Sequence, residues 1–470
     1  MWRRLVGTGR ATRPEKLVIA EELQSHAVAT ISRERADSIV ADPGRFPGVD
    51  VREGRRRAYA ASAPVHLLGT RLAATGVDAT RGADGIERIF DAHLAGVPGE
   101  RVVRTDRDGG VARVEPVRDP LPGHDLVLTI DGGLQAAVAA ACDELVDRGA
   151  AVVLDVDSGA VLAIASRPAF DAEAASARDT RFWDTIGGQD ADPLFDRALN
   201  GRYRAGAAVA PFIVAAAVDA GVVGAESQFF CGSPGGEADD HPCPIVGETA
   251  LGHGTVTLRD AISLPCVASL AALSDALAEK KREHPLAVFG FGDDYQTDLP
   301  HRAAGVLSTA RTDGSQDSRF RHRLGTSRVT PLEMARAAAA LAGGGRLPTP
   351  HVVRGLGVRA AAGTRATVPA VTPSRTAVDP LAAATALSGM RAAVEDPAGS
   401  THGLAAVSSA AVAAIGGHVV DAASVHDWAI AAWPADGPTR VIAVVVEDVR
   451  PGMAERVAGR VITADTSADD

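Results

Sequence analysis

The sequence is short of residue types on which many enzyme mechanisms depend. Among its 470 residues lysine occurs three times, at Lys16, Lys280 and Lys281, and asparagine once, at Asn200. Nearly all of the positive charge is therefore arginine, and a mechanism that needs a lysine or an asparagine in the middle of the fold has almost no candidates. The four cysteines are too few for a scaffold of several disulfides or for an array of zinc ribbons.

Long apolar runs and a net positive charge are missing as well. The formal net charge of −11 provides no global attraction to nucleic acid or to anionic lipid, so we expect no nucleic-acid partner. The longest apolar stretch, residues 207–218, contains Pro211 and is shorter than the roughly 20 residues that span a bilayer. No apolar run of a signal peptide follows the basic start. We expect a buried core helix at 207–218, and a membrane contact only through an anchor that this chain does not contain.

The remaining composition predicts a folded protein with an uneven organisation. Hydrophobic residues make up 46% and charged residues 23% of the chain, which is typical of globular domains. Residues 1–45 show no clear pattern. Residues 46–122 are rich in arginine, glycine and proline, with short extended pieces at 101–103 and 111–114, which indicates a strand-bearing module. Residues 123–462 have the pattern of one large mixed α/β domain.

The order of the expected elements in that domain suggests one sheet made from distant parts of the chain. A turn at 157–159 joins two apolar runs into a hairpin. We expect strands at 125–131, 151–156, 160–164 and 440–448, helices at 133–147, 207–220, 257–279 and 331–343, and a loop at 356–380. Strands near both ends of the domain with helices between them favour a common sheet.

Short motifs occur along the chain in a particular order. In the first module they are residues 46–49 with Arg57 and Tyr59, residues 66–69, and residues 85–91. In the second they are residues 128–135, the hairpin at 151–165, Arg197, Ala198, Tyr203 and Gly206, residues 252–254, and residues 330–335. No single piece is specific, but their order resembles the class B penicillin-binding proteins, the D,D-transpeptidases that cross-link peptidoglycan.

This resemblance implies a two-part architecture. A smaller strand-rich dimerisation-type module at 46–122 precedes a transpeptidase/β-lactamase-like domain at 123–462. The second domain is expected to have a central antiparallel sheet flanked by helices, an α/β fold of the α+β type. The resemblance also implies a place on the extracytoplasmic face of the membrane, in the cell envelope.

The chemistry of that family depends on the motifs S-x-x-K, S-x-N and K-T-G. In this chain the equivalent positions hold, in order, Ala207 and Ala210, Pro265 and Val267, and Ile415, Gly416 and Gly417. No shift of register restores a motif, because no lysine has a serine three residues before it or Thr-Gly after it. The only asparagine likewise has no serine two residues before it.

Without the serine hydroxyl and the lysine amine, we interpret the chain as a non-catalytic homologue. Its expected role is structural or regulatory, with other cell-wall synthesis proteins or a second copy as partner. Two alternatives stay open: an active D,D-transpeptidase that binds penicillin, and a non-covalent receptor for peptidoglycan stem peptides or β-lactams. We expect a drier, smaller cleft, with the helix of Ala207 in the domain centre and a kink near Pro211.

A relocated nucleophile is a weaker alternative. Ser263 or Ser269 could act with His253 or His418 as the base, but nothing in the sequence fixes their geometry.

The cysteines allow two further interpretations. Cys231 and Cys243 flank a Gly/Pro-rich stretch that contains His241, with His253 beyond it. Zinc ligation is conceivable there, but the cysteine spacing is not that of a zinc finger. We favour a Cys231–Cys243 disulfide, because the family folds outside the cytoplasm. Cys142 and Cys266 are interpreted as small buried residues, and neither a metal nor a cofactor is expected.

Overall fold

The chain divides into two compact units. One comprises Met1–Ala58 and Gly96–Gly123, and the other Tyr59–Ala95 and His124–Asp470. The computed structural model describes residues 32–42, 44–46, 49, 51, 58–73, 80–97, 99–105, 111–119, 121, 123–176, 180–189, 191–231, 252–280, 284–308, 327–357, 373–406, 412–420 and 425–467.

The first unit contains a helix and a β-ribbon. Helix α3 (Arg33–Ala41) begins where the Ser32 hydroxyl accepts a hydrogen bond from the Arg35 amide, an arrangement that stabilises the first turn. Strands β3 (Glu100–Thr105) and β4 (Val111–Arg118) pair antiparallel. The extended pieces expected at 101–103 and 111–114 are confirmed.

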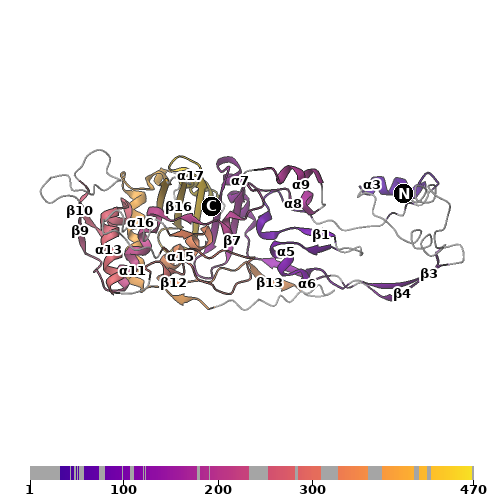
Figure 1. The fold of residues 1–470 in the computed structure, drawn as a ribbon, viewed down its shortest axis with the longest axis horizontal. Coiled ribbons are helices and arrows are strands. Elements are labelled where there is room, and N and C mark those ends of the chain that lie inside the picture. Colours follow the sequence, from indigo (N-terminus) through magenta and orange to yellow (C-terminus); the bar gives the residue numbers. More distant parts are fainter. Residues whose placement is uncertain are drawn as a thin grey trace. The chain divides into compact units, whose positions relative to one another are not determined.

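The second unit holds the remaining described elements (Figure 1). Its strands are β1 (Arg71–Ala73), β2 (Thr80–Gly82), β5 (Asp125–Leu128), β6 (Gly149–Asp155), β7 (Val161–Arg167), β8 (Tyr203–Arg204), β9 (Gln228–Cys231), β10 (Gly254–Thr257), β11 (Arg328–Val329), β12 (Arg346–Leu347), β13 (Val353–Gly357), β14 (Arg375–Thr376), β15 (Ala413–Val420), β16 (Val425–Trp433) and β17 (Arg440–Glu447). Its helices are α4 (Val65–Leu68), α5 (Gly85–Ile89), α6 (Asp91–Leu94), α7 (Gly132–Leu145), α8 (Ala172–Ser176), α9 (Thr180–Ile186), α10 (Arg197–Asn200), η1 (Gly206–Val209), α11 (Ala210–Asp219), α12 (Leu258–Ser263), α13 (Val267–Lys280), η2 (Ala287–Phe289), α15 (Pro331–Ala342), α16 (Pro380–Glu395), η4 (His402–Ala406) and α17 (Met453–Thr466).

A five-stranded antiparallel sheet organises this unit. Its order is β15-β16-β17-β6-β7. The hairpin β6–β7 lies far from β15–β17 in the sequence, and β17 pairs directly with β6. The expected sheet built from distant parts of the chain is therefore confirmed.

Both faces of the sheet are covered by helices, because its central strands are apolar on both sides. In β6, Val152 and Leu154 belong to one core cluster, and Ala151 and Val153 to the other, as the two-residue period of a strand requires. Helices α15 and α16 pack on the first face and α7 and α17 on the second (Figure 1). The result is a helix–sheet–helix sandwich.

Two expected helices differ in detail from the structure. The segment 207–220 is a 3₁₀ turn, η1, followed by α11, and Pro211 lies in the first turn of α11. A proline there removes no helical hydrogen bond, and the change from 3₁₀ to α geometry falls directly before Pro211; the kink expected near Pro211 stays a prediction. The helix expected over 257–279 is two helices, because the chain turns at Leu264 and Pro265.

The loop expected at 356–380 is described only at its ends, where β13 stops at Gly357 and β14 and the start of α16 follow; its middle lies outside the described residues. In the described part of the chain, no helix is both long and apolar enough to cross a membrane.

Candidate functional site

The first degenerate motif lies at the start of the buried helix α11. Ala207 is half-buried in η1, and Ala210, the first residue of α11, is fully buried. The next eight residues of α11 are apolar and buried as well. The position at which the family has its serine therefore carries only a methyl group, at the edge of an apolar helix.

The third degenerate motif lies on β15, in direct contact with η1. A Cβ atom added to Gly417 would lie 2.9 Å from the Ala208 amide nitrogen and 3.3 Å from its Cβ. A Cβ added to Gly206, whose φ is +55°, would lie 2.5 Å from a methyl carbon of Val419. The close approach of β15 to η1 therefore depends on glycine on both sides. This contact is called the η1–β15 junction below.

The second degenerate motif lies at the turn between α12 and α13. Pro265 is buried and Val267 is half-buried at the start of α13. The Ser400 amide donates a hydrogen bond to the Ser263 carbonyl oxygen at 3.0 Å. Thr401, which follows Ser400, lies beside the strand of the third motif: a Cβ added to Gly416 would lie 3.2 Å from the Thr401 methyl carbon. Residues 400–401 thus link the turn of the second motif to the strand of the third.

The polar residue directly after the third degenerate motif, His418, contacts a buried carboxylate on the neighbouring strand. His418, which follows Gly417, places Nδ1 at 3.4 Å from the Asp427 carboxylate. The other Asp427 oxygen accepts a hydrogen bond from the Ala454 amide at 2.9 Å. Burial raises the pKa of Asp427, although these contacts oppose the shift. The pair links β15 and β16 to the start of α17.

The contacts of the alternative serines do not form a nucleophile–base pair. The Ser263 hydroxyl lies 3.5 Å from the Asp260 carbonyl oxygen, and the Ser269 hydroxyl donates to the Cys266 sulfur at 3.3 Å. In the described part of the chain, no hydrogen bond joins either serine to His253 or His418. The geometry gives the relocated-nucleophile alternative no support.

Arg197 and Tyr203 of the shared motifs form a buried network with Glu447. The Arg197 guanidinium Nε and the Tyr203 hydroxyl donate to the same Glu447 oxygen, at 2.9 and 2.8 Å. Arg148 reaches the other oxygen at 2.6 Å. Burial, followed by the nearby Glu447 charge, raises the pKa of Tyr203, so its hydroxyl remains a donor. This Glu447 network holds α10 and β8 against β17, and its role is structural.

A cavity of about 110 Å³ lies against β7. It is lined by His66, another residue of the shared motifs, and by Gln135, Arg167 and Asp196. The His66 ring packs edge-on against Phe170 at a centroid distance of 5.0 Å. Burial lowers its pKa, which favours the neutral ring. None of the degenerate motif positions lines this cavity.

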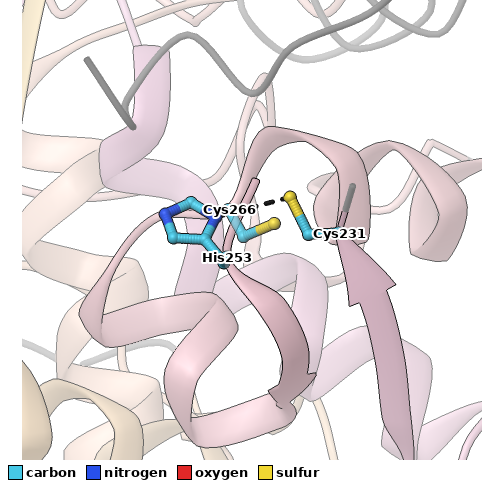
Figure 2. Close-up of side chains that lie close together, drawn as sticks. All are labelled: Cys231, His253 and Cys266. Carbon is cyan, nitrogen blue, oxygen red and sulfur yellow. Dashed lines mark hydrogen bonds between the residues drawn. The ribbon is translucent and has the colours of Figure 1, made fainter. Parts of the chain in front are cut away.

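One group of side chains has the donor atoms of a metal site. Cys231, His253 and Cys266 each place a sulfur or ring nitrogen within 4.8 Å of the other two (Figure 2). Cys266 is buried, as the sequence predicts, but its proximity to Cys231 was missed because it depends on how β9 packs beside the α12–α13 turn. His241 and Cys243 lie outside the described residues, so the Cys231–Cys243 disulfide stays a prediction.

Comparison with known proteins identifies the fold. The penicillin binding protein transpeptidase domain matches residues 149–465, and the penicillin-binding protein dimerisation domain matches residues 7–128. The peptidoglycan D,D-transpeptidase FtsI of Escherichia coli (strain K12) is 28% identical over 307 residues, which cover 63% of this chain and 48% of FtsI. The chain thus spans about half the length of the curated relatives it matches.

Solved structures agree with the sequence comparison. Pseudomonas aeruginosa PBP2, crystallised with WCK 5153, is 26% identical with a TM-score of 0.65, covering 82% of each chain. PBP2 of Helicobacter pylori, in a complex with MreC, has the same fold, with a TM-score of 0.73 at 19% identity over 94% of this chain and 84% of the other. The expected sheet flanked by helices, preceded by a dimerisation-type module, is confirmed. Because the transpeptidase domain match covers more than half of the chain, the protein belongs to the penicillin-binding protein transpeptidase family, within its class B.

Proposed function

We propose that this chain is a catalytically inactive penicillin-binding protein that acts as a structural or regulatory partner in peptidoglycan synthesis. The observation that carries the proposal is Ala207 in η1, the turn directly before α11. Acyl transfer in this family needs a serine hydroxyl activated by a basic neighbour, and neither Ala207 nor Ala210 offers a reactive atom. In subtilisin, loss of the nucleophile costs about 10⁶ in turnover.

The packing around the degenerate positions supports the same proposal. Ala210, Pro265 and Ile415 are buried apolar residues where the family has polar ones. A buried polar atom that loses its partner costs about 1–3 kcal/mol. A site with only one motif replaced would carry several such atoms, whereas replacement at all three motifs avoids the penalty. The η1–β15 junction therefore fits a region adapted to packing.

The relatives suggest where the protein acts and with what class of partner. The FtsI and MrdA relatives are named as peptidoglycan D,D-transpeptidases, and the Helicobacter pylori PBP2 neighbour was solved with MreC. By analogy, we place this chain in the cell envelope, on the extracytoplasmic face, bound to another wall-synthesis protein or to its own copy. We assign association to the module at 46–122 and the inactive transpeptidase-like fold to residues 123–462.

Covalent labelling with a fluorescent penicillin tests the central claim. β-Lactams are retained when a serine opens the ring and forms an ester, so the folded wild-type chain should show no label that survives denaturation. Ala207→Ser alone should remain unlabelled, because its hydroxyl lacks an activating base. Ala207→Ser with Ala210→Lys should recover little, since the positions of Pro265, Val267 and Ile415 still lack their polar groups.

The labelling needs two controls. A class B relative with intact motifs shows that the reagent is active, and heat-denatured wild-type chain shows the nonspecific background. Stoichiometric, fold-dependent acylation of the wild-type chain, mapped to any residue between 200 and 430, would overturn the proposal in favour of an active transpeptidase.

A further inference from the structure

The outer edge of strand β7 is partly completed by a side chain. β7 is the last strand of the five-stranded sheet, and in the described part of the chain no strand pairs with its outer side. The Gln135 carboxamide lies there instead. Its oxygen accepts from the Ile164 N–H at 2.9 Å, and its nitrogen donates to the Ile164 carbonyl oxygen at 3.1 Å. One amide group from α7 thus binds this edge as a peptide group of a further strand would.

Ser166 repeats the orientation of Ile164 two residues along β7. Residues two apart in a strand direct their N–H and C=O groups to the same side, so the Ser166 groups point outward as well. Arg167 Nη1 donates to the Ser166 carbonyl oxygen at 3.1 Å. Among the described residues, no hydrogen bond to the Ser166 N–H is found. The edge therefore offers one unpaired backbone donor at Ser166.

The cavity of about 110 Å³ against β7 lies at this position, because Ile164 and Ser166 both line it. Its volume accommodates several water molecules, and therefore a small ligand. Ala169 and Asp143 also line the cavity. Ala169 is exposed, and the Asp143 side chain is 66% exposed, so the cavity reaches solvent on their side. The unpaired donor thus lies at the wall of a space that a small molecule can enter.

The wall of the cavity also carries two hydrogen-bond acceptors, on His66 and Asp196. His66 Nε2 lies 2.8 Å from the Pro193 carbonyl oxygen, so Nε2 carries the proton, and the neutral ring has Nδ1 as an acceptor. The Asp196 carboxylate accepts from the Ser166 hydroxyl through Oδ1 at 2.7 Å, which leaves Oδ2 as the second acceptor. A donor and two acceptors therefore line one small space.

The charges around the cavity favour a neutral ligand. Arg167 Nη2 lies 2.8 Å from the Asp143 carboxylate, so the guanidinium in the wall is neutralised by a carboxylate in the wall. The Asp196 carboxylate accepts from two backbone N–H groups at the start of α10, which stabilise its charge. A carboxylate ligand would meet two like charges, and an ammonium ligand has no acceptor for the Ser166 N–H.

We propose that this cavity binds a primary carboxamide. The ligand oxygen accepts from the Ser166 N–H, and the ligand NH₂ group donates to His66 Nδ1 and to the Asp196 carboxylate. The arrangement repeats the contact of the Gln135 amide two residues further along β7. A small free amide and a glutamine side chain of a partner chain present the same group. Because none of the degenerate motif positions lines the cavity, the site is independent of the inactive-enzyme proposal.

Propionamide is the probe, because it is the glutamine side chain as a free molecule. Saturation-transfer difference NMR on the full chain compares its binding with that of propionate and propylammonium, which match its size. We expect millimolar binding of propionamide, as for ligands of this size, and binding of each control about fivefold weaker, the value of one net hydrogen bond. Equal binding of all three, or stronger binding of a control, would overturn the carboxamide assignment. No saturation transfer to propionamide at tens of millimolar would refute the site.

Two substitutions at exposed positions locate the bound amide. Ala169→Leu fills the mouth of the cavity and should weaken propionamide binding tenfold or more. Ala384→Leu, on the exposed face of α16 and outside the cavity lining, should bind as the wild type does. Unchanged binding in Ala169→Leu would place the ligand elsewhere and refute the site, and an equal loss in Ala384→Leu would mark the binding as unspecific.

The His66 acceptor is tested by His66→Phe. A phenyl ring keeps the edge-on contact with Phe170 and removes Nδ1, so propionamide should bind about fivefold more weakly. Full affinity in the folded variant would contradict the role of His66 in the site. If the variant does not fold, the Ala169→Leu comparison still decides whether the cavity holds the amide.

Blocked tripeptides distinguish the two sources of the amide. Displacement of propionamide by Ala-Gln-Ala, but not by Ala-Glu-Ala, assigns the site to a side chain of a partner chain. If neither peptide displaces propionamide, the site takes a small free amide, because a peptide backbone does not pass the mouth. Equal displacement by both peptides would show that the carboxamide is not recognised and would overturn the proposal.

Discussion

The η1–β15 junction and the Glu447 network are both central to the fold, yet their chemistry is opposite. At the junction, Ala208 and Gly417 meet through backbone and methyl groups. In the network, charged Arg197 and Glu447 are 4% and 14% exposed and are joined by hydrogen bonds. Both regions contain positions of family motifs. The difference shows that this chain keeps buried polar groups where they hold elements together and has apolar ones at the positions of the reactive groups.

The comparison also explains how an inactive chain keeps the family's architecture. Buried polar groups are tolerated when each has its partners, and Glu447 has three, in Arg148, Arg197 and Tyr203. Loss of one member leaves the others buried without compensation, so the set persists as a unit. The catalytic groups have no such role in stability once turnover is not required.

The largest expected effect comes from breaking the Glu447 network. Glu447→Ala leaves the buried Arg197 guanidinium without its carboxylate partner, and we expect a loss of about 3–5 kcal/mol in the free energy of unfolding. Urea unfolding followed by circular dichroism measures it. Glu395→Ala is the control, because Glu395 pairs with Arg259 across an exposed surface, where a change within about 0.5 kcal/mol is expected. Equal losses in both variants would contradict a special role for the network.

A smaller effect should come from crowding the η1–β15 junction. The methyl group of Gly417→Ala would lie 2.9 Å from the Ala208 amide nitrogen, so strand and turn must separate, at a cost of about 1–3 kcal/mol. In Gly132→Ala, at the start of α7, the added Cβ meets nothing within 4 Å, and stability should hold or rise. If Gly417→Ala is as stable as Gly132→Ala, the junction is open space and the tight-packing argument fails.

The sequence predicted the sheet well because its strands carry local signals. The apolar runs of β6, β7 and β17, with the turn at 157–159, are visible without tertiary information. The helix expected at 331–343 is confirmed as α15, where Thr330 and Glu333 form a capping box and three glycines follow. Motif order then identified the family, which no single motif could do.

The parts that could not be predicted depend on contacts between distant segments. The sequence predicts one long helix across the turn at Pro265, because the apolar periodicity continues on both sides of that turn. The approach of Cys266 to Cys231 follows from packing of α13 beside β9, which no local pattern encodes. The residue identities alone predict that all three motif positions lack reactive groups. How the three positions lie relative to one another can be seen only in the folded structure.

The smallest predicted effect is a pH dependence at Asp427, a polar residue beside the junction. Burial raises its pKa above the ordinary value, against the opposing influence of the Ala454 amide and His418, and Glu455, whose pKa burial also raises, lies nearby. The folded state therefore binds the Asp427 proton more tightly than the unfolded state does. This contribution to stability is complete below the unfolded-state pKa and is lost as the pH rises through the folded-state pKa.

Asp427→Asn removes this titration while keeping an oxygen that can accept from the Ala454 amide. The unfolding free energy of the variant, relative to wild type, should therefore increase as the pH rises from about 4 to neutrality. Chemical unfolding of both proteins at several pH values measures the difference. Asp294→Asn, at a fully exposed position, controls for charge removal as such. The same trend in that control would assign the effect to charge removal alone. A difference that falls with pH for Asp427→Asn would show that His418 and the Ala454 amide outweigh burial, and would make Asp427 a member of the stabilising polar framework like Glu447.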